Sequence, residues 1–105
     1  MATYLLSYHG GGMGDTPEQQ AEELAKWQAW FGSIGPDMVD PGLPIAFAQT
    51  VAPSGAVSDG GGANPVTGYT ILRAADIGAA VDVARRCPLL GTGGSIEVGQ
   101  TLDMG

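Results

Sequence analysis

The residue best suited to acid–base chemistry is His9, the only histidine in the 105-residue chain. It ends a predicted strand and precedes a glycine loop at residues 10–14. An imidazole there can act as a general base when a nearby carboxylate orients it, and Asp59, which begins an Asp-Gly turn, can supply that carboxylate. We therefore predict His9 and Asp59 as a catalytic pair. The alternative is a solvated histidine at a strand end and an aspartate that bonds its own backbone in a turn.

Four further side chains are candidates for ligand binding, because strand alternation places them on one face of a sheet. They are Ser7, Tyr69, Arg73 and Glu97. Arg73 and Glu97 either form an ion pair inside a cavity or lie separately on its rim. Together the four side chains would offer a bound small molecule a positive charge, a negative charge, a hydroxyl and an aromatic ring.

No motif points to a metal or another cofactor. The His, Cys and carboxylate residues lack metal-ligand spacing, and the glycine loops fit neither G-x-x-x-x-G-K-[ST] nor G-x-G-x-x-G. The run at residues 9–12 is similar to the oxyanion loop of esterases, but the G-x-S-x-G motif that accompanies that loop is missing. Cys87 is either a structural thiol or one acidified by Arg85 or Arg86. We expect no cofactor and no metal.

Composition limits the partners. The formal net charge is −7, with only four basic residues, so nucleic acid and anionic membranes are unfavourable partners. One cysteine excludes an internal disulfide and suits a reducing compartment. The sequence has no apolar run of membrane-spanning length and no signal-peptide pattern at its start. We expect a cytoplasmic protein.

Two helices are predicted from their caps. Thr16 and Gln19 form a capping box, and the first helix ends at Gly35-Pro36. Asp76 caps the second helix, which ends before Pro88. The apolar stripes predicted to be buried are Leu24, Trp27, Trp30, Phe31 and Ile34 in the first helix, and Ile77, Ala80, Val81 and Ala84 in the second.

The strands follow from alternating apolar residues. They are expected at residues 2–9, 45–51, 69–72 and 96–98, with a short additional strand at 56–58, while residues 38–44 are expected to form a loop. The order β-α-β-(β)-β-α-β is the ferredoxin-like βαββαβ pattern. We therefore predict an α+β fold with an antiparallel sheet, as a single domain over residues 1–105.

Three segments carry a family resemblance: GYTILRAAD at residues 68–76, AAVDVARRCP at 79–88 and GSIEV at 94–98. Together with Asp59-Gly60 they make the chain similar, over nearly its whole length, to the YCII-related family and in particular to its DGPF-type branch. The resemblance implies a dimeric α/β barrel in which two sheets face each other. Some related members are small-molecule enzymes with a His-Asp pair. The predicted first helix contains no histidine, so no catalytic residue is carried over from them.

Strand alternation independently favours a homodimer. The residues expected to face the helices are Tyr4, Leu6, Tyr8, Leu72, Ile96 and Val98. The opposite face then carries Leu5 and Ile71 beside His9 and the four ligand candidates. This apolar patch is large for a small monomer. A second copy covering it would enclose the polar side chains in a cavity suited to a small ligand.

Three classes of function follow. The first is a dimeric small-molecule-binding protein of the YCII-related type. The second is a small lyase or isomerase that transfers a proton through His9 and a carboxylate. The third is an accessory or structural dimerisation domain. We favour the first class, because it fits the resemblance and because no catalytic pair is carried over from the related enzymes.

Overall fold

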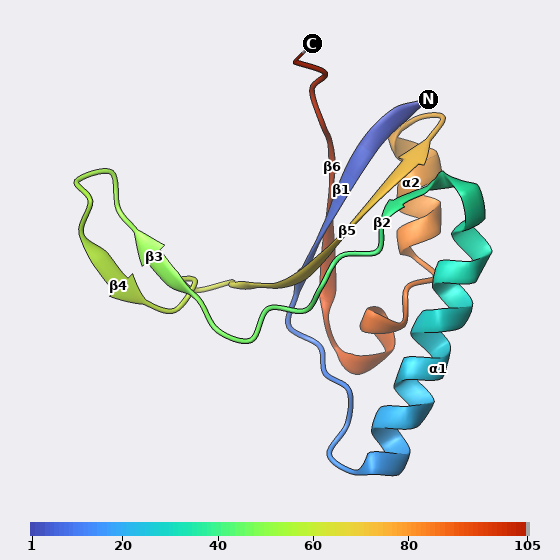
Figure 1. Ribbon diagram of the computed structural model, residues 1–105, viewed down its shortest axis with the longest axis horizontal. Coiled ribbons are helices and arrows are strands. Elements are labelled where there is room, and N and C mark those ends of the chain that lie inside the picture. Colours follow the sequence, from blue (N-terminus) through green and yellow to red (C-terminus); the bar gives the residue numbers. More distant parts are fainter. Residues whose placement is uncertain (105) are drawn as a thin grey trace.

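A four-stranded antiparallel sheet with two helices on one face forms the body of the protein, as the computed structural model shows for residues 1–104 (Figure 1). The sheet order is β2-β5-β1-β6. The elements are β1 (Ala2–His9), α1 (Pro17–Ile34), η1 (Gly35–Asp37), β2 (Met38–Asp40), β3 (Gln49–Val51), β4 (Val57–Asp59), β5 (Val66–Ala74), α2 (Ile77–Ala84), η2 (Pro88–Thr92) and β6 (Ser95–Gln100). The predicted α+β class and antiparallel sheet are confirmed, and the arrangement is compatible with a ferredoxin-like fold.

β1 lies at the centre of the sheet and pairs with both β5 and β6. Leu5 lies opposite Ile71 on one side and opposite Gly99 on the other. Ser7 lies opposite Tyr69 and Glu97 in the same way. The register therefore brings the predicted open-face residues of three strands next to one another.

The second strand of the sheet was predicted in the wrong place. It is β2, in the segment expected to be a loop, and it pairs with β5 at the edge of the sheet. Of the strand expected at residues 45–51 only Gln49–Val51 forms, and it pairs with β4 in a separate two-stranded sheet. Pro41, Gly42 and Pro44 interrupt the chain after β2 and redirect it away from the body. The alternation of residues 45–51 thus marks extended backbone but not a strand of the main sheet.

Both predicted helix caps are present. Thr16 Oγ1 accepts from the Gln19 backbone, and the Gln19 side chain accepts from the Thr16 backbone in return. Asp76 Oδ1 accepts from Ala79 N at 2.8 Å. These local bonds satisfy the first backbone N–H groups of each helix and set where each helix begins.

The core lies between the sheet and the helices. It contains the predicted sheet residues Tyr4, Leu6, Tyr8 and Leu72, with Trp30 from α1. Trp30 Nε1 donates to the Val83 carbonyl oxygen at 3.0 Å and so ties α1 to α2. Because the indole N–H is satisfied, the ring can be buried at little polar cost.

Two predicted core residues are exposed. Leu24 of α1 and Ile77 of α2 are each 51% exposed. Leu24 lies over a cavity instead of over the sheet, and Ile77 is the first residue of a short helix that buries Ala80 and Ala84. The helical spacing correctly predicts both helices. It does not show how far the sheet extends beneath each helical turn.

β3 and β4 form a hairpin that projects from the body (Figure 1). We call residues 45–65 the arm, and every one of them is exposed. The arm widens the molecule to 44 × 42 × 18 Å.

Candidate functional site

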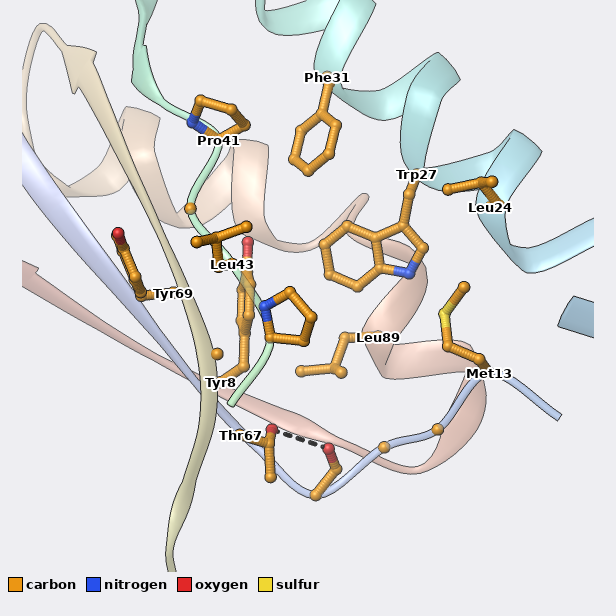
Figure 2. Close-up of a pocket in the computed structure, with 16 residues that line it drawn as sticks. Tyr8, Met13, Leu24, Trp27, Phe31, Pro41, Leu43, Thr67, Tyr69 and Leu89 are labelled. Atoms are coloured by element: carbon orange, nitrogen blue, oxygen red, sulfur yellow. Dashed lines mark hydrogen bonds between the residues drawn. The ribbon is translucent and has the colours of Figure 1, made fainter. Parts of the chain in front are cut away.

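An apolar cavity of about 380 Å³ lies beside α1 (Figure 2). It is bounded by α1, by the glycine loop after β1, by residues 41–44, which we call the strap, and by the start of β5. Its lining residues are Tyr8, Gly10, Gly11, Gly12, Met13, Leu24, Trp27, Phe31, Pro41, Gly42, Leu43, Pro44, Thr67, Gly68, Tyr69 and Leu89. Its volume falls within the range of small-molecule sites.

Aromatic rings form the wall on the helix side. The ring centroids of Trp27 and Tyr8 are 5.4 Å apart in an edge-on arrangement at 70°. Phe31 lies 5.7 Å from Trp27. Leu89 from η2 and Leu43 from the strap face these rings across the cavity (Figure 2). Each ring packs on its neighbours, so the wall exists without a ligand.

Two glycines allow close packing of the chain around the cavity. Gly11 has φ +79°, and a Cβ there would lie 2.4 Å from Leu89 Cδ1. Gly42 has φ +76°, and a Cβ there would lie 1.7 Å from the Tyr69 carbonyl oxygen. Only glycine tolerates both the positive φ and the close contact. The strap therefore lies against the β5 backbone at a position that admits no side chain, and the glycine loop packs on Leu89 of η2.

Hydrogen bonds hold the strap and the loop in place. The Tyr8 hydroxyl donates to Thr70 Oγ1, and Thr70 Oγ1 donates to the Pro41 carbonyl oxygen at 2.9 Å. Thr67 Oγ1 donates to the Gly10 carbonyl oxygen at 3.0 Å, the dashed line in Figure 2. Burial raises the pKa of Tyr8 well above its usual value, so the phenol stays protonated and can keep its donor role.

The chemistry of the cavity is that of a neutral apolar site. None of its lining residues carries a charge. An ionised ligand group would lose its water there without gaining a partner, which is strongly unfavourable. The arrangement thus fits an apolar or aromatic small molecule.

The structure does not join the predicted catalytic pair by a hydrogen bond. His9 Nδ1 lies 3.1 Å from the Asn64 carbonyl oxygen and 3.2 Å from that of Pro65. Asp59 Oδ1 instead accepts from Gln49 Nε2 at 3.1 Å, across the arm. Since carbonyl oxygens only accept, Nδ1 of a neutral His9 carries the proton and Nε2 is its basic nitrogen.

A second, open hollow lies at the base of the arm. Its lining includes Phe47, Asp59 and Pro65, and its volume is about 760 Å³. Asp59 thus lies at a concave surface, but His9 is not part of the lining.

The four ligand candidates lie away from the cavity wall, apart from Tyr69. Tyr69 lines the cavity, and its hydroxyl donates to Asp40 Oδ2 at 3.3 Å. Arg73 is exposed and donates to the Pro36 carbonyl oxygen at 2.7 Å. Ser7 and Glu97 are neighbours on the sheet face opposite the helices, as the alternation predicts.

Cys87 is 3% exposed. Burial raises the pKa of its thiol to about 11, with smaller opposing contributions from hydrogen bonds to Leu89 and Tyr8. A protonated, buried thiol is a poor nucleophile, which agrees with the structural interpretation.

Residues 1–104 contain neither a metal-ligating cluster nor a membrane-spanning helix. In that part of the chain, no group of three or more His, Cys, Asp or Glu side chains is placed to hold a metal ion. No helix there has the length and hydropathy needed to cross a membrane.

Comparison of the chain with protein-family models and with curated proteins gave no match. The assignment of the cavity as a candidate site therefore rests on its geometry alone.

The sequence does not predict this cavity. Its helical spacing predicts that Trp27, Phe31 and Leu24 belong to the buried stripe of the first helix, and Met13 and Leu43 fall in predicted loops. The available signal was the pair of Gly- and Pro-rich segments at residues 10–14 and 41–44, each carrying an isolated large apolar residue. Nothing in the sequence says that these segments meet beside the first helix.

Proposed function

We propose that this protein is a homodimeric small-molecule-binding protein of the YCII-related type, and that its ligand occupies the cavity beside α1. The observation that carries the proposal is the cavity of about 380 Å³, with rings on one side and glycine-bearing backbone on the other. Pockets that are largely formed before binding are typical of small-molecule sites. The ligand site proposed from geometry thus lies on the helix side of the sheet, and Tyr69 is shared with the site expected from the sequence.

The ligand class follows from the lining. The walls are apolar and uncharged, so we expect a neutral molecule with one or two aromatic rings or a comparable aliphatic body. Orientation would come from hydroxyl groups, the indole N–H of Trp27 and backbone groups of the lining residues, including those of the glycine loop and the strap.

The homodimer rests on the open sheet face. Leu5 and Ile71 lie opposite each other there, and Leu5 is exposed. Arg73 and Glu97 supply one charge of each sign to the same face, so two copies of it carry no net repulsion. A second copy would remove the apolar pair from water.

A lyase or isomerase is the second candidate function, and the tautomer of His9 favours it. The Asn64 and Pro65 carbonyl oxygens hold the Nδ1 proton, which leaves Nε2 as a base at the end of β1. Asp59 is engaged by Gln49 and does not orient the ring. Binding therefore ranks above catalysis, and an accessory dimerisation role without a ligand ranks third.

The proposal is tested with the neutral probe N-phenyl-1-naphthylamine, whose emission rises in apolar surroundings. We expect saturable binding to the wild-type protein. Leu43→Gln, at an exposed residue of the cavity wall, should weaken probe affinity at least about fivefold, because a polar amide replaces apolar lining. Leu102→Gln is the matched control, since Leu102 is exposed and lies outside the cavity.

Absence of saturable binding to the wild-type protein would contradict the proposal and favour the accessory role. An equal loss in the Leu43 and Leu102 variants would place the probe elsewhere.

A further inference from the structure

The arm projects from the body, and each of its residues is exposed. We infer that it is a dimerisation arm, which packs its apolar side chains against a second copy of this chain. The inference rests on the proposed homodimer and adds to it a second contact outside the sheet face.

The arm is well ordered by its own hydrogen bonds. Val51 pairs with Val57, and Gln49 pairs with Asp59. Ala52 N donates to the Ala56 carbonyl oxygen at 2.8 Å and closes the turn. At the base, Gly60 N donates to the Ala48 carbonyl oxygen at 2.9 Å, and Thr50 Oγ1 donates to the Gly60 carbonyl oxygen at 2.7 Å. An isolated two-stranded hairpin is at best marginally stable in water. A hairpin this regular therefore needs a surface to pack on.

The arm exposes large apolar side chains. Phe47 is 91% exposed, Val51 68% and Val57 59%. Single exposed residues of this kind are ordinary. Here they are joined along one hairpin, because Val51 and Val57 face each other across it and Phe47 lies just before it. The open hollow at the base of the arm continues this surface with Ile45 and Pro65.

The surface area of the chain matches what a dimer requires. A compact monomer of 10.6 kDa exposes about 5,500 Å², whereas this chain exposes 6812 Å². The excess is about 1,300 Å², and a stable interface buries about 800 Å² on each partner. The radius of gyration is 15.0 Å, which likewise exceeds the value of about 13 Å expected for this length.

Charge favours a second copy over other partners. Between Pro41 and Leu72 the only charged residue is Asp59, although the whole chain carries a net charge of −7. Two copies can therefore meet along the arm with little repulsion, whereas nucleic acid and anionic membranes would be repelled by the rest of the molecule. The arm also continues from the start of β5, whose Ile71 belongs to the sheet face proposed for the dimer.

The test is sedimentation equilibrium of the full chain and two arm variants. In one variant residues 49–59 are deleted, so that Ala48 joins Gly60; their hydrogen bond shows that these positions are already adjacent. In the other, Phe47→Ser changes one exposed side chain and leaves the hairpin intact. Each should raise the dimer dissociation constant at least about tenfold. Ile77→Ser, an exposed apolar residue of α2, is the matched control and should leave it unchanged.

The possible outcomes distinguish a failure of the arm inference from a failure of the proposed homodimer. If Leu5→Glu dissociates the dimer but both arm variants dimerise like the wild type, the arm inference is wrong and the sheet-face homodimer stands. A wild-type protein that is monomeric at micromolar concentration overturns both. Binding of N-phenyl-1-naphthylamine should survive the arm deletion, because no residue of the arm lines the cavity; its loss would mean that the arm serves the ligand site and would overturn the inference.

Discussion

Two buried hydroxyl groups, those of Tyr8 and Thr70, connect the sheet to the strap. The Tyr8 hydroxyl donates to Thr70, whose own proton goes to Pro41 of the strap. Burial raises the pKa of both Tyr8 and Cys87. Desolvation keeps both groups neutral, so they serve structure and not nucleophilic chemistry.

This burial makes stability depend on pH. The thiol has a usual pKa of 9.0 and a folded-state pKa of about 11. Between these values the unfolded chain loses the proton while the native chain keeps it, so the free energy of unfolding falls as pH rises. We expect a fall of about 2 kcal/mol between pH 8 and pH 10.5, measured by urea unfolding.

Cys87→Ala is the variant that isolates this effect. It should lower stability at pH 8 but flatten the decline, leaving the contribution of Tyr8 above about pH 10. An identical decline in both proteins would show that the thiol does not titrate differently in the two states.

The strap is the element that closes the cavity, and Gly42 determines its path. Gly42→Ala should reduce the free energy of unfolding by about 2–4 kcal/mol, because it adds a contact with the Tyr69 carbonyl oxygen to the penalty of a positive φ. It should also weaken probe binding, since the strap would have to move. Unfolding in urea and probe titration together measure both effects.

Gly93→Ala provides the control. Gly93 has φ +88°, and a Cβ there would meet nothing within 4 Å. This variant should show only the backbone penalty, of about 1 kcal/mol, and unchanged probe affinity. Equal losses in the two variants would mean that the close contact at Gly42 is relieved without displacing the strap.

Elements also show where sequence reasoning succeeds. Thr16 and Asp76 predict where their helices begin, because a helix cap is formed by residues that are close together in the sequence. The three-residue strand β2 has no such local signal. It pairs with β5 because of the position in which η1 ends, and this position is set by the folded structure. The cavity is harder still, because Met13, Leu43 and Leu89 come from three separate segments and meet only in the folded chain.

The sheet of the molecule has two faces with different surroundings. The helix face encloses the proposed ligand cavity, whereas the open sheet face and the arm expose apolar surface, which we propose is covered by a second copy. Alternation along β1 and β5 predicts both faces of the sheet. It does not predict the arm, because residues 45–51 show the same alternation as a strand of the body. The difference lies in what the apolar residues meet after folding, which for Phe47 is solvent in a single copy.

The central claim is tested most directly by the two indole N–H resonances in a ¹H–¹⁵N NMR titration with N-phenyl-1-naphthylamine. Trp27 lines the cavity, whereas Trp30 is buried and bonded to Val83. We predict that the Trp27 resonance shifts and saturates while the Trp30 resonance moves little. An unchanged Trp27 resonance at saturating probe would contradict a ligand site beside α1.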